Sequence, residues 1–164
     1  MAAGTQTLTT ANKKAFWRKI KQATNYSYNV PLDPGGLFAF DSGSQTVAAT
    51  NTETADDELF VLQFPDGAYL VDLQAEFSDL DTGANLILNT IVETSGGTET
   101  ILMTGTNPQS AVKDQLDADA GHLLRDVGGQ YLGFKVTTGA AGGAQAGTVR
   151  YKGLIWIGTP LTGF

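Results

Sequence analysis

The chain has 164 residues and a net charge of −7, a length that suits one domain with its own hydrophobic core and leaves no room for a second. It contains no cysteine, which excludes disulfides, thiolate nucleophiles and cysteine-ligated zinc. No stretch approaches the roughly 20 apolar residues that would span a bilayer, and the polar first residues lack the apolar core of a signal peptide. We therefore expect neither a membrane protein nor secretion by the ordinary route. The 20 glycines and the scattered aromatic residues predict a mostly β protein.

Charge is distributed very unevenly along the chain. Residues 1–24 carry five basic residues and no acid, whereas residues 25–164 carry 17 carboxylates against five basic residues. Such asymmetry between a tail and a body indicates an interaction arm. The acidic body argues against nucleic acid as a partner, because phosphate binding requires a positive surface. We therefore predict an N-terminal arm at residues 1–24 and a β domain at residues 25–164.

The arm contains a segment, residues 12–24, that is typical of a short basic amphipathic helix. Phe16 and Ile20 fall on one apolar stripe, and basic residues take the remaining face. About a dozen residues make a marginal helix, so the stripe should dock either on the protein's own body or on a neighbouring subunit. A membrane surface is not expected as a partner, because the apolar face is narrow and anionic lipid would repel the acidic body. The predicted docking residues are Lys13, Lys14, Phe16, Trp17, Arg18, Lys19 and Ile20.

Two candidate edge strands follow the arm, at residues 26–30 and 37–40, separated by the turn sequence PLDPGG. Residues 51–58, with the sequence NTETADDE, then form a polar loop. Its carboxylates could bind a cation, but such a run is more often a solvated loop, and we expect no metal. These carboxylates are Glu53, Asp56, Asp57 and Glu58.

The remaining chain predicts three hairpins. The first joins residues 59–64 to 69–77 through a turn at Pro65, Asp66 and Gly67. The second surrounds residues 95–97, and the third joins residues 130–138 to 148–157 and closes the domain through a flexible loop of glycine and alanine. In the second strand of the first hairpin, every other residue should face the core. These are Tyr69, Val71, Leu73, Ala75 and Phe77.

Two intervening segments are less regular. Asp79, Asp81 and Gly83 resemble the start of a calcium loop, but the position that would need a bidentate glutamate is Thr90, so we predict a turn. Residues 107–121 predict a long loop or a helical turn, followed by a further short strand. The total of about eight strands, with turns at this spacing, predicts an antiparallel jelly roll or β-sandwich, with the short N-terminal helix outside the sheets.

No set of residues indicates a reaction, and we expect no enzyme and no cofactor. His122 is the only histidine, and no serine lies in a Gly-x-Ser-x-Gly context. Pairs of acids suitable for glycoside hydrolysis can be drawn in any acidic β protein, so they indicate nothing before their separation is known. The aromatic residues could instead form a platform for stacking sugars. They are Trp17, Tyr26, Tyr28, Tyr69, Tyr131, Tyr151 and Trp156.

The last predicted hairpin, with the sequences QYLGFKVTT and TVRYKGLIWI around GAAGGAQAG, resembles the ending of small jelly-roll virion proteins of tailed bacteriophages. These are head-decoration, cement and fibre-like accessory proteins. The resemblance covers the last third of the chain, and the hairpins between residues 59 and 104 fit the same plan. It implies a jelly-roll fold and carries no catalytic or ligand-binding residues with it.

The resemblance and the residues together predict a virion structural protein, assembled in the host cytoplasm, that decorates or cements a capsid. Its partners would be the major capsid protein or another virion protein, reached through the arm, and its own copies, as a closed oligomer such as a trimer. Two alternatives stay open. One is a carbohydrate-binding or host-adhesion module, and the other is a tail or neck component of the virion.

Overall fold

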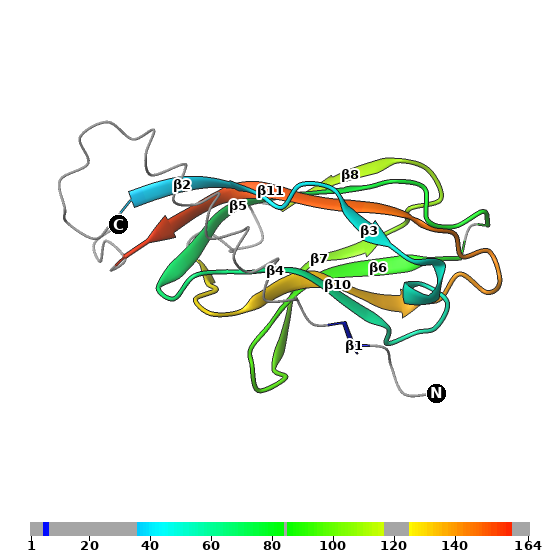
Figure 1. Cartoon of the computed structure of the whole chain (residues 1–164), viewed down its shortest axis with the longest axis horizontal. Coiled ribbons are helices and arrows are strands. Elements are labelled where there is room, and N and C mark those ends of the chain that lie inside the picture. Colours follow the sequence, from blue (N-terminus) through cyan, green and yellow to red (C-terminus); the bar gives the residue numbers. More distant parts are fainter. Residues whose placement is uncertain (1–4, 7–35, 84, 117–124, 159–164) are drawn as a thin grey trace.

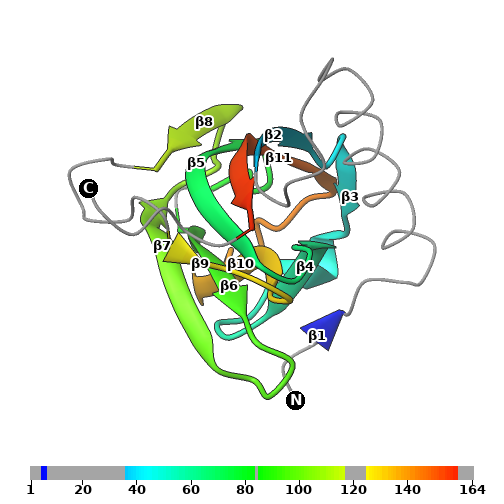
Figure 2. The same ribbon diagram turned by 90° about the vertical axis from the view of Figure 1, so that its left-hand side faces the viewer.

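The computed structural model describes residues 5–6, 36–83, 85–116 and 125–158, which form two β-sheets packed face to face (Figures 1 and 2). Apart from one short 3-10 turn, η1 (Ala49–Asn51), the regular structure in these ranges is strand, which confirms the prediction of a mostly β protein. The strands are β1 (Thr5–Gln6), β2 (Gly36–Asp41), β3 (Gln45–Val47), β4 (Glu58–Gln63), β5 (Ala68–Phe77), β6 (Ile87–Glu93), β7 (Glu99–Thr106), β8 (Val112–Gln115), β9 (Arg125–Asp126), β10 (Tyr131–Thr138) and β11 (Gly147–Ile157).

The strand order of the two sheets defines the fold. One sheet has the order β1-β4-β10-β6-β7, and we call it sheet A. The other, sheet B, has the order β2-β11-β5-β8, with β3 beside β11 and β9 beside β5. All pairings are antiparallel except that of β1 with β4, which is parallel.

Six of the pairings are nested inside one another along the chain, in four levels. The innermost is β6 with β7, followed outward by β5 with β8 and β9, then β4 with β10, and finally β2 and β3 with β11. The chain is therefore one long antiparallel ribbon, doubled back at the turn between β6 and β7. The pairs β5 with β11 and β6 with β10 close the rolled ribbon into two sheets. This rolled ribbon is a jelly roll, as the sequence predicted.

Only one of the three predicted hairpins exists as a hairpin. The second is confirmed, because β6 and β7 pair directly around the turn at residues 95–97. The first and third are wrong: β4 and β10 lie in sheet A, whereas β5 and β11 lie in sheet B. The strands themselves are where the sequence placed them, but their connections cross from one sheet to the other. Alternation of apolar residues identifies a strand and its buried face, and leaves its partner undetermined.

The segment at residues 107–121, predicted as a loop or helical turn, contains the edge strand β8. Its sequence, VKDQ, is too short and too polar to stand out, since one side of an edge strand faces solvent. The further short strand predicted after it is β9. The predicted helix of the arm, the candidate strand at residues 26–30 and His122 lie outside the described residues, and the division into arm and domain stays a prediction.

The core lies between the sheets, and a β-bulge corrects one predicted face. The pairing of β5 with β11 shifts between Leu154 and Ile155, so β5 carries one extra residue at Val71. Beyond the bulge Leu73, Ala75 and Phe77 are buried as predicted. Before it the alternation is reversed, and the inward residues are Ala68 and Leu70 instead of Tyr69 and Val71.

Candidate assembly surfaces

The predicted docking residues of the arm lie outside the described residues, so the candidate functional surfaces of the body are the outer faces of its two sheets. The outer face of sheet B is divided along β11. One half carries a network of charged side chains, and the other carries apolar and aromatic ones. The outward side chains of β11 belong to its even-numbered residues, because alternate residues of a strand face opposite sides of the sheet and Val149, Tyr151 and Ile155 are buried.

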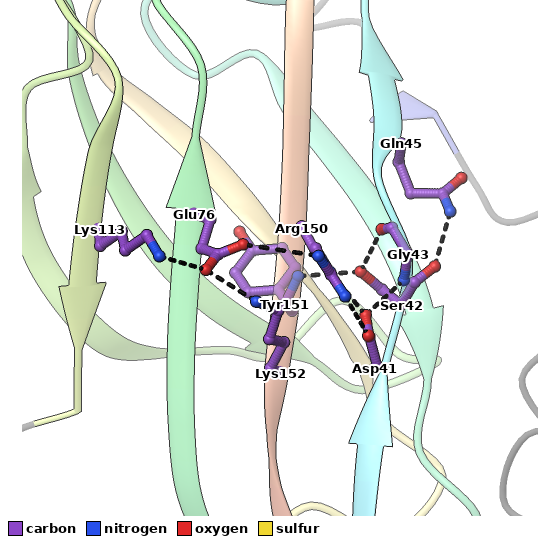
Figure 3. Close-up of polar contacts among 9 residues, drawn as sticks. All are labelled: Asp41, Ser42, Gly43, Gln45, Glu76, Lys113, Arg150, Tyr151 and Lys152. Atoms are coloured by element: carbon purple, nitrogen blue, oxygen red, sulfur yellow. Dashed lines mark hydrogen bonds and ion pairs between the residues drawn. The ribbon is translucent and has the colours of Figure 1, made fainter.

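We call the charged half the ladder, because it crosses four neighbouring strands (Figure 3). Arg150 on β11 donates two hydrogen bonds to the Asp41 carboxylate on β2, one of them from Nε at 2.9 Å. On the other side, Glu76 on β5 accepts from Lys152 Nζ at 2.8 Å and lies 3.0 Å from Lys113 Nζ on β8. Hydrogen bonds from Lys152 and Lys113 hold the pKa of Glu76 below its usual value. The ladder thus joins β2, β11, β5 and β8 through paired charges.

The corner between β2 and β3 positions Asp41 at the end of this ladder (Figure 3). Gly43 has a φ of 65°, which favours glycine, and its N–H donates to Asp41 Oδ1 at 2.8 Å. The Ser42 hydroxyl accepts the backbone N–H of Tyr151 at 2.9 Å, while the Ser42 N–H donates to the Tyr151 carbonyl oxygen at 2.9 Å. The edge strand therefore bends without losing its attachment to β11.

The other half of this face we call the apolar patch. Leu37 on β2, Trp156 on β11 and Tyr69 on β5 are opposite one another in one cross-strand row. In the next row Ala39 and Leu154 are paired. Leu37 is 54% exposed, Ala39 is exposed, and the other three are half-buried. Large apolar side chains on the outer side of a sheet indicate a surface that another group covers.

On sheet A, a different set of charges converges on one lysine. Lys135 Nζ on β10 lies 2.7 Å from Glu99 Oε1 on β7 and 3.1 Å from Glu58 Oε1 on β4. Glu93 on β6 completes what we call the glutamate cluster, Glu58, Glu93 and Glu99. Burial raises the pKa of Glu58, which the Lys135 ammonium partly offsets, and burial together with Glu99 raises the pKa of Glu93. The pKa of Lys135 is raised, chiefly by its hydrogen bond with Glu99.

The glutamate cluster could hold a metal by distance alone, because its three carboxylates offer oxygens within 4.8 Å of one another. The Lys135 ammonium, however, already binds two of these carboxylates and supplies a positive charge. Among the loop carboxylates that the sequence singled out, Glu58 belongs to the glutamate cluster, and Asp56 lies 3.7 Å from the same Lys135 Nζ. Asp57 instead accepts the backbone N–H of Thr54 at 3.2 Å within the loop. The other glutamates come from strands far away in sequence, which is why the sequence did not reveal the cluster.

Asp81 confirms the predicted turn. Its carboxylate accepts three backbone N–H groups, from Gly83 at 2.8 Å, Leu86 at 2.9 Å and Asn85 at 3.0 Å. Burial raises the pKa of this carboxyl, but the three hydrogen bonds together outweigh burial and leave the pKa below its usual value. Both oxygens are therefore used by the turn itself.

The glycine and alanine loop between β10 and β11 is attached to the same turn. Thr82 N–H donates to Gly143 O at 2.9 Å, Gln145 N–H donates to Leu80 O at 3.0 Å, and Ala144 forms an isolated bridge with Asp81. The loop is therefore a pinned crossover between sheets, and the prediction of a flexible hairpin connection is wrong.

The described residues contain no histidine, and within these ranges we find no serine or threonine placed beside a base and an oxyanion site. Among the described residues, fewer aromatic side chains are available for stacking sugars than the sequence suggested. Tyr151 is fully buried, and Tyr131 is half-buried against Phe60 with ring centroids 6.1 Å apart. Trp156 and Tyr69 stay neighbours on the outer face. Within the described ranges, no helix has the length and apolarity needed to cross a bilayer.

Comparison with known proteins gives similarity at the level of fold. The structure superposes on a chain of the capsid of Ralstonia phage GP4 with a TM-score of 0.59 and 22% identity, covering 84% of this chain and 94% of that one. It superposes on a chain of the cyanophage Pam1 capsid asymmetric unit with a TM-score of 0.55 and 22% identity, covering 82% and 96%. The chain shares its fold with these phage capsid chains. No protein-family model matches the sequence, and no curated protein sequence matches it.

Proposed function

We propose that this chain is a structural protein of a bacteriophage virion that decorates or cements the capsid. The observation that carries the proposal is the fold, shared with chains of two phage capsids. Those chains are covered over 94% and 96% of their length, so each consists of little more than this one jelly roll. A small chain of this kind suits an accessory component that sits on a shell. The absence of a catalytic arrangement among the described residues, and neighbours that come from capsids, agree with a role that involves no reaction.

Attachment would use the arm and the body differently. The basic and aromatic residues of the arm, at positions 13–20, would dock on an acidic or apolar site of the shell. The body would contact other copies of itself, as a cyclic oligomer such as a trimer. Contacts between copies need not bury the charged pairs of the ladder. Paired surface charges add little to the affinity of an interface and mainly set the orientation of the partners.

The test is association with purified particles. The chain should copurify with the particle at a fixed copy number, and a map of the particle should place it on the outside of the head. A variant lacking residues 1–24 should lose particle association while keeping the thermal unfolding transition of the body. As a matched control, Lys113→Gln on the ladder changes one basic residue of the body, and should keep particle association. Full occupancy by the truncated chain would refute the arm hypothesis, and absence from particles would refute the virion role.

A carbohydrate-binding role is the second candidate, and the adjacent half-exposed rings of Trp156 and Tyr69 favour it. A glycan-array signal that is lost in Trp156→Ala would support it. Silence on the array together with copurification would favour decoration. A tail or neck position differs from decoration only in location, which the same particle map decides.

A further inference from the structure

The apolar patch of sheet B is unusual because of its position on an outward face. On the same strand, Arg150 and Lys152 point outward and are charged, as expected for the solvated face of an antiparallel sheet. The next two outward positions of β11 are the apolar residues Leu154 and Trp156. Trp156 is opposite Leu37, which is 54% exposed. The change from charged to apolar within one strand indicates a boundary between a solvated surface and a covered one.

The acidic residues around the patch are also unlike those of the ladder. Asp72 is opposite Leu154, and Asp126 is opposite Tyr69, so both lie at the rim of the patch. Neither forms an ion pair with another described residue, although Asp126 Oδ1 accepts the backbone N–H of Gly128 at 3.0 Å, whereas Asp41 and Glu76 in the ladder are both paired with basic side chains. The rim therefore offers two carboxylates to a basic group. A ligand that suits the whole surface is apolar on one side and positively charged on the other.

The chain itself supplies a segment of that chemistry, and the path of the chain brings it to the patch. In the helix predicted for residues 12–24, Phe16 and Ile20 would fall on one stripe and basic residues on the remaining face. This segment is followed by residues 25–35 and then by Gly36, the first residue of β2, which pairs with Ile157 next to the patch. Eleven residues reach up to about 36–40 Å. Four strands of a sheet span only about 15–20 Å, so the segment can reach every part of the patch of its own chain.

We propose that residues 12–24 pack in cis on the apolar patch in the free protein. Phe16 and Ile20 lie against Leu37, Leu154 and Trp156, and the basic side chains lie near the two unpaired rim carboxylates. The contact shields the patch from solvent and holds the arm close to the body. Because the proposal concerns the free protein, it does not depend on the virion role. If that role is also correct, docking of the arm on a particle competes with this contact and uncovers the patch.

The chain offers a direct readout, because its two tryptophans are Trp17 in the arm and Trp156 in the patch. In the full-length variant Trp17→Phe, Trp156 is the sole tryptophan, and its emission reports the cover over the patch. In that background, Phe16→Asp combined with Ile20→Asp should shift the emission of Trp156 to the red and increase its quenching by acrylamide. The matched control is Ala15→Asp with Gln22→Asp, which adds the same charge outside the apolar stripe and should shift the emission much less, since it weakens only the charge contacts.

A second pair of variants tests the rim. Asp72→Lys with Asp126→Lys in the Trp17→Phe background should give the same red shift, because the basic face of the arm is repelled. Glu53→Lys changes an exposed acid in the loop before β4 and should not shift the emission.

Far-UV circular dichroism and the thermal transition establish that each variant is folded. Emission that stays the same in all stripe and rim variants would overturn the proposal, and so would a red shift of the Trp17→Phe protein on simple dilution, which would show a contact between copies. Particle association is measured separately, so either hypothesis can fail alone.

Discussion

Lys135 is the residue whose replacement tests the electrostatics of sheet A most directly. In Lys135→Met the side chain keeps much of its apolar length, and the ammonium is lost. That ammonium lies 2.7 Å from Glu99, 3.1 Å from Glu58 and 3.7 Å from Asp56. The variant therefore leaves the glutamate cluster without its cation. The carboxylates then repel one another, and the Glu58 side chain is only 10% exposed to the solvent that would screen the repulsion.

The expected loss can be worked from these contacts. A hydrogen bond to a charged group contributes about 1.5–3 kcal/mol when buried, and exposed ion pairs contribute less than about 1 kcal/mol. The Lys135 side chain is 23% exposed and binds one well-buried partner, Glu58, and one whose side chain is 31% exposed, Glu99, so we expect a loss of about 2 kcal/mol at neutral pH. For a chain of this size that corresponds to a fall in Tm of about 4–8 °C.

The loss should depend on pH with a defined sign. Burial and Glu99 place the pKa of Glu58 above its value in the unfolded chain, and removal of Lys135 raises it further. A carboxyl with a raised pKa in the folded state favours folding below its unfolded pKa of about 4.5, and this contribution is lost as the pH rises through the folded pKa. The difference in Tm between wild type and Lys135→Met should therefore be largest at neutral pH and should narrow as the pH falls toward 4.5.

Thermal unfolding followed by circular dichroism across this pH range measures the effect. The matched control is Lys113→Met, which makes the same chemical change at a side chain that is 68% exposed and has one carboxylate partner. It should cost no more than about 0.5 kcal/mol. Equal losses in the two variants, or a Lys135→Met deficit that widens on acidification, would refute the reasoning.

Three further changes test other parts of the fold by urea denaturation. Gly133→Ala would place a Cβ 2.1 Å from Leu59 O, so we expect a loss of about 3 kcal/mol or more, while Gly96→Ala in the β6–β7 turn should be nearly neutral because its nearest neighbour would be 3.8 Å away. Tyr151→Phe should change stability by less than about 1 kcal/mol, because the buried hydroxyl has no well-formed hydrogen bond; a loss above about 2 kcal/mol would contradict this. Asp81→Ala should cost about 2–4 kcal/mol at neutral pH, since three backbone N–H groups lose their acceptor. Because the pKa of Asp81 is lowered on folding, this cost should become smaller as the pH falls through its folded value; a cost that stays the same or grows at low pH would contradict this.

Several features of this protein are determined by short stretches of sequence. Strands β5, β10 and β11 can be recognised from alternation, since each buries one face. The turn at Asp81 can be recognised too, because an aspartate two residues before a glycine supplies the acceptor that the turn needs. The class of fold follows from the number and spacing of such strands.

Tertiary structure decided which strands pair and which side chains meet. The turn at residues 65–67 is compatible both with a hairpin and with a crossover between sheets, and only the packing of the whole ribbon selects the crossover. The bulge at Val71 likewise depends on the register of β5 against β11, and it inverts the face on which Tyr69 lies.

The candidate surfaces are also decided by the tertiary structure. The glutamate cluster and Lys135 come from four strands, and the ladder comes from another four, so no local pattern could reveal either. The apolar patch depends on the register that places Leu37, Trp156 and Tyr69 in one row. Alternation is a property of one strand and can be recognised from its sequence. A surface is a property of neighbouring strands, and it exists only after the ribbon has rolled up.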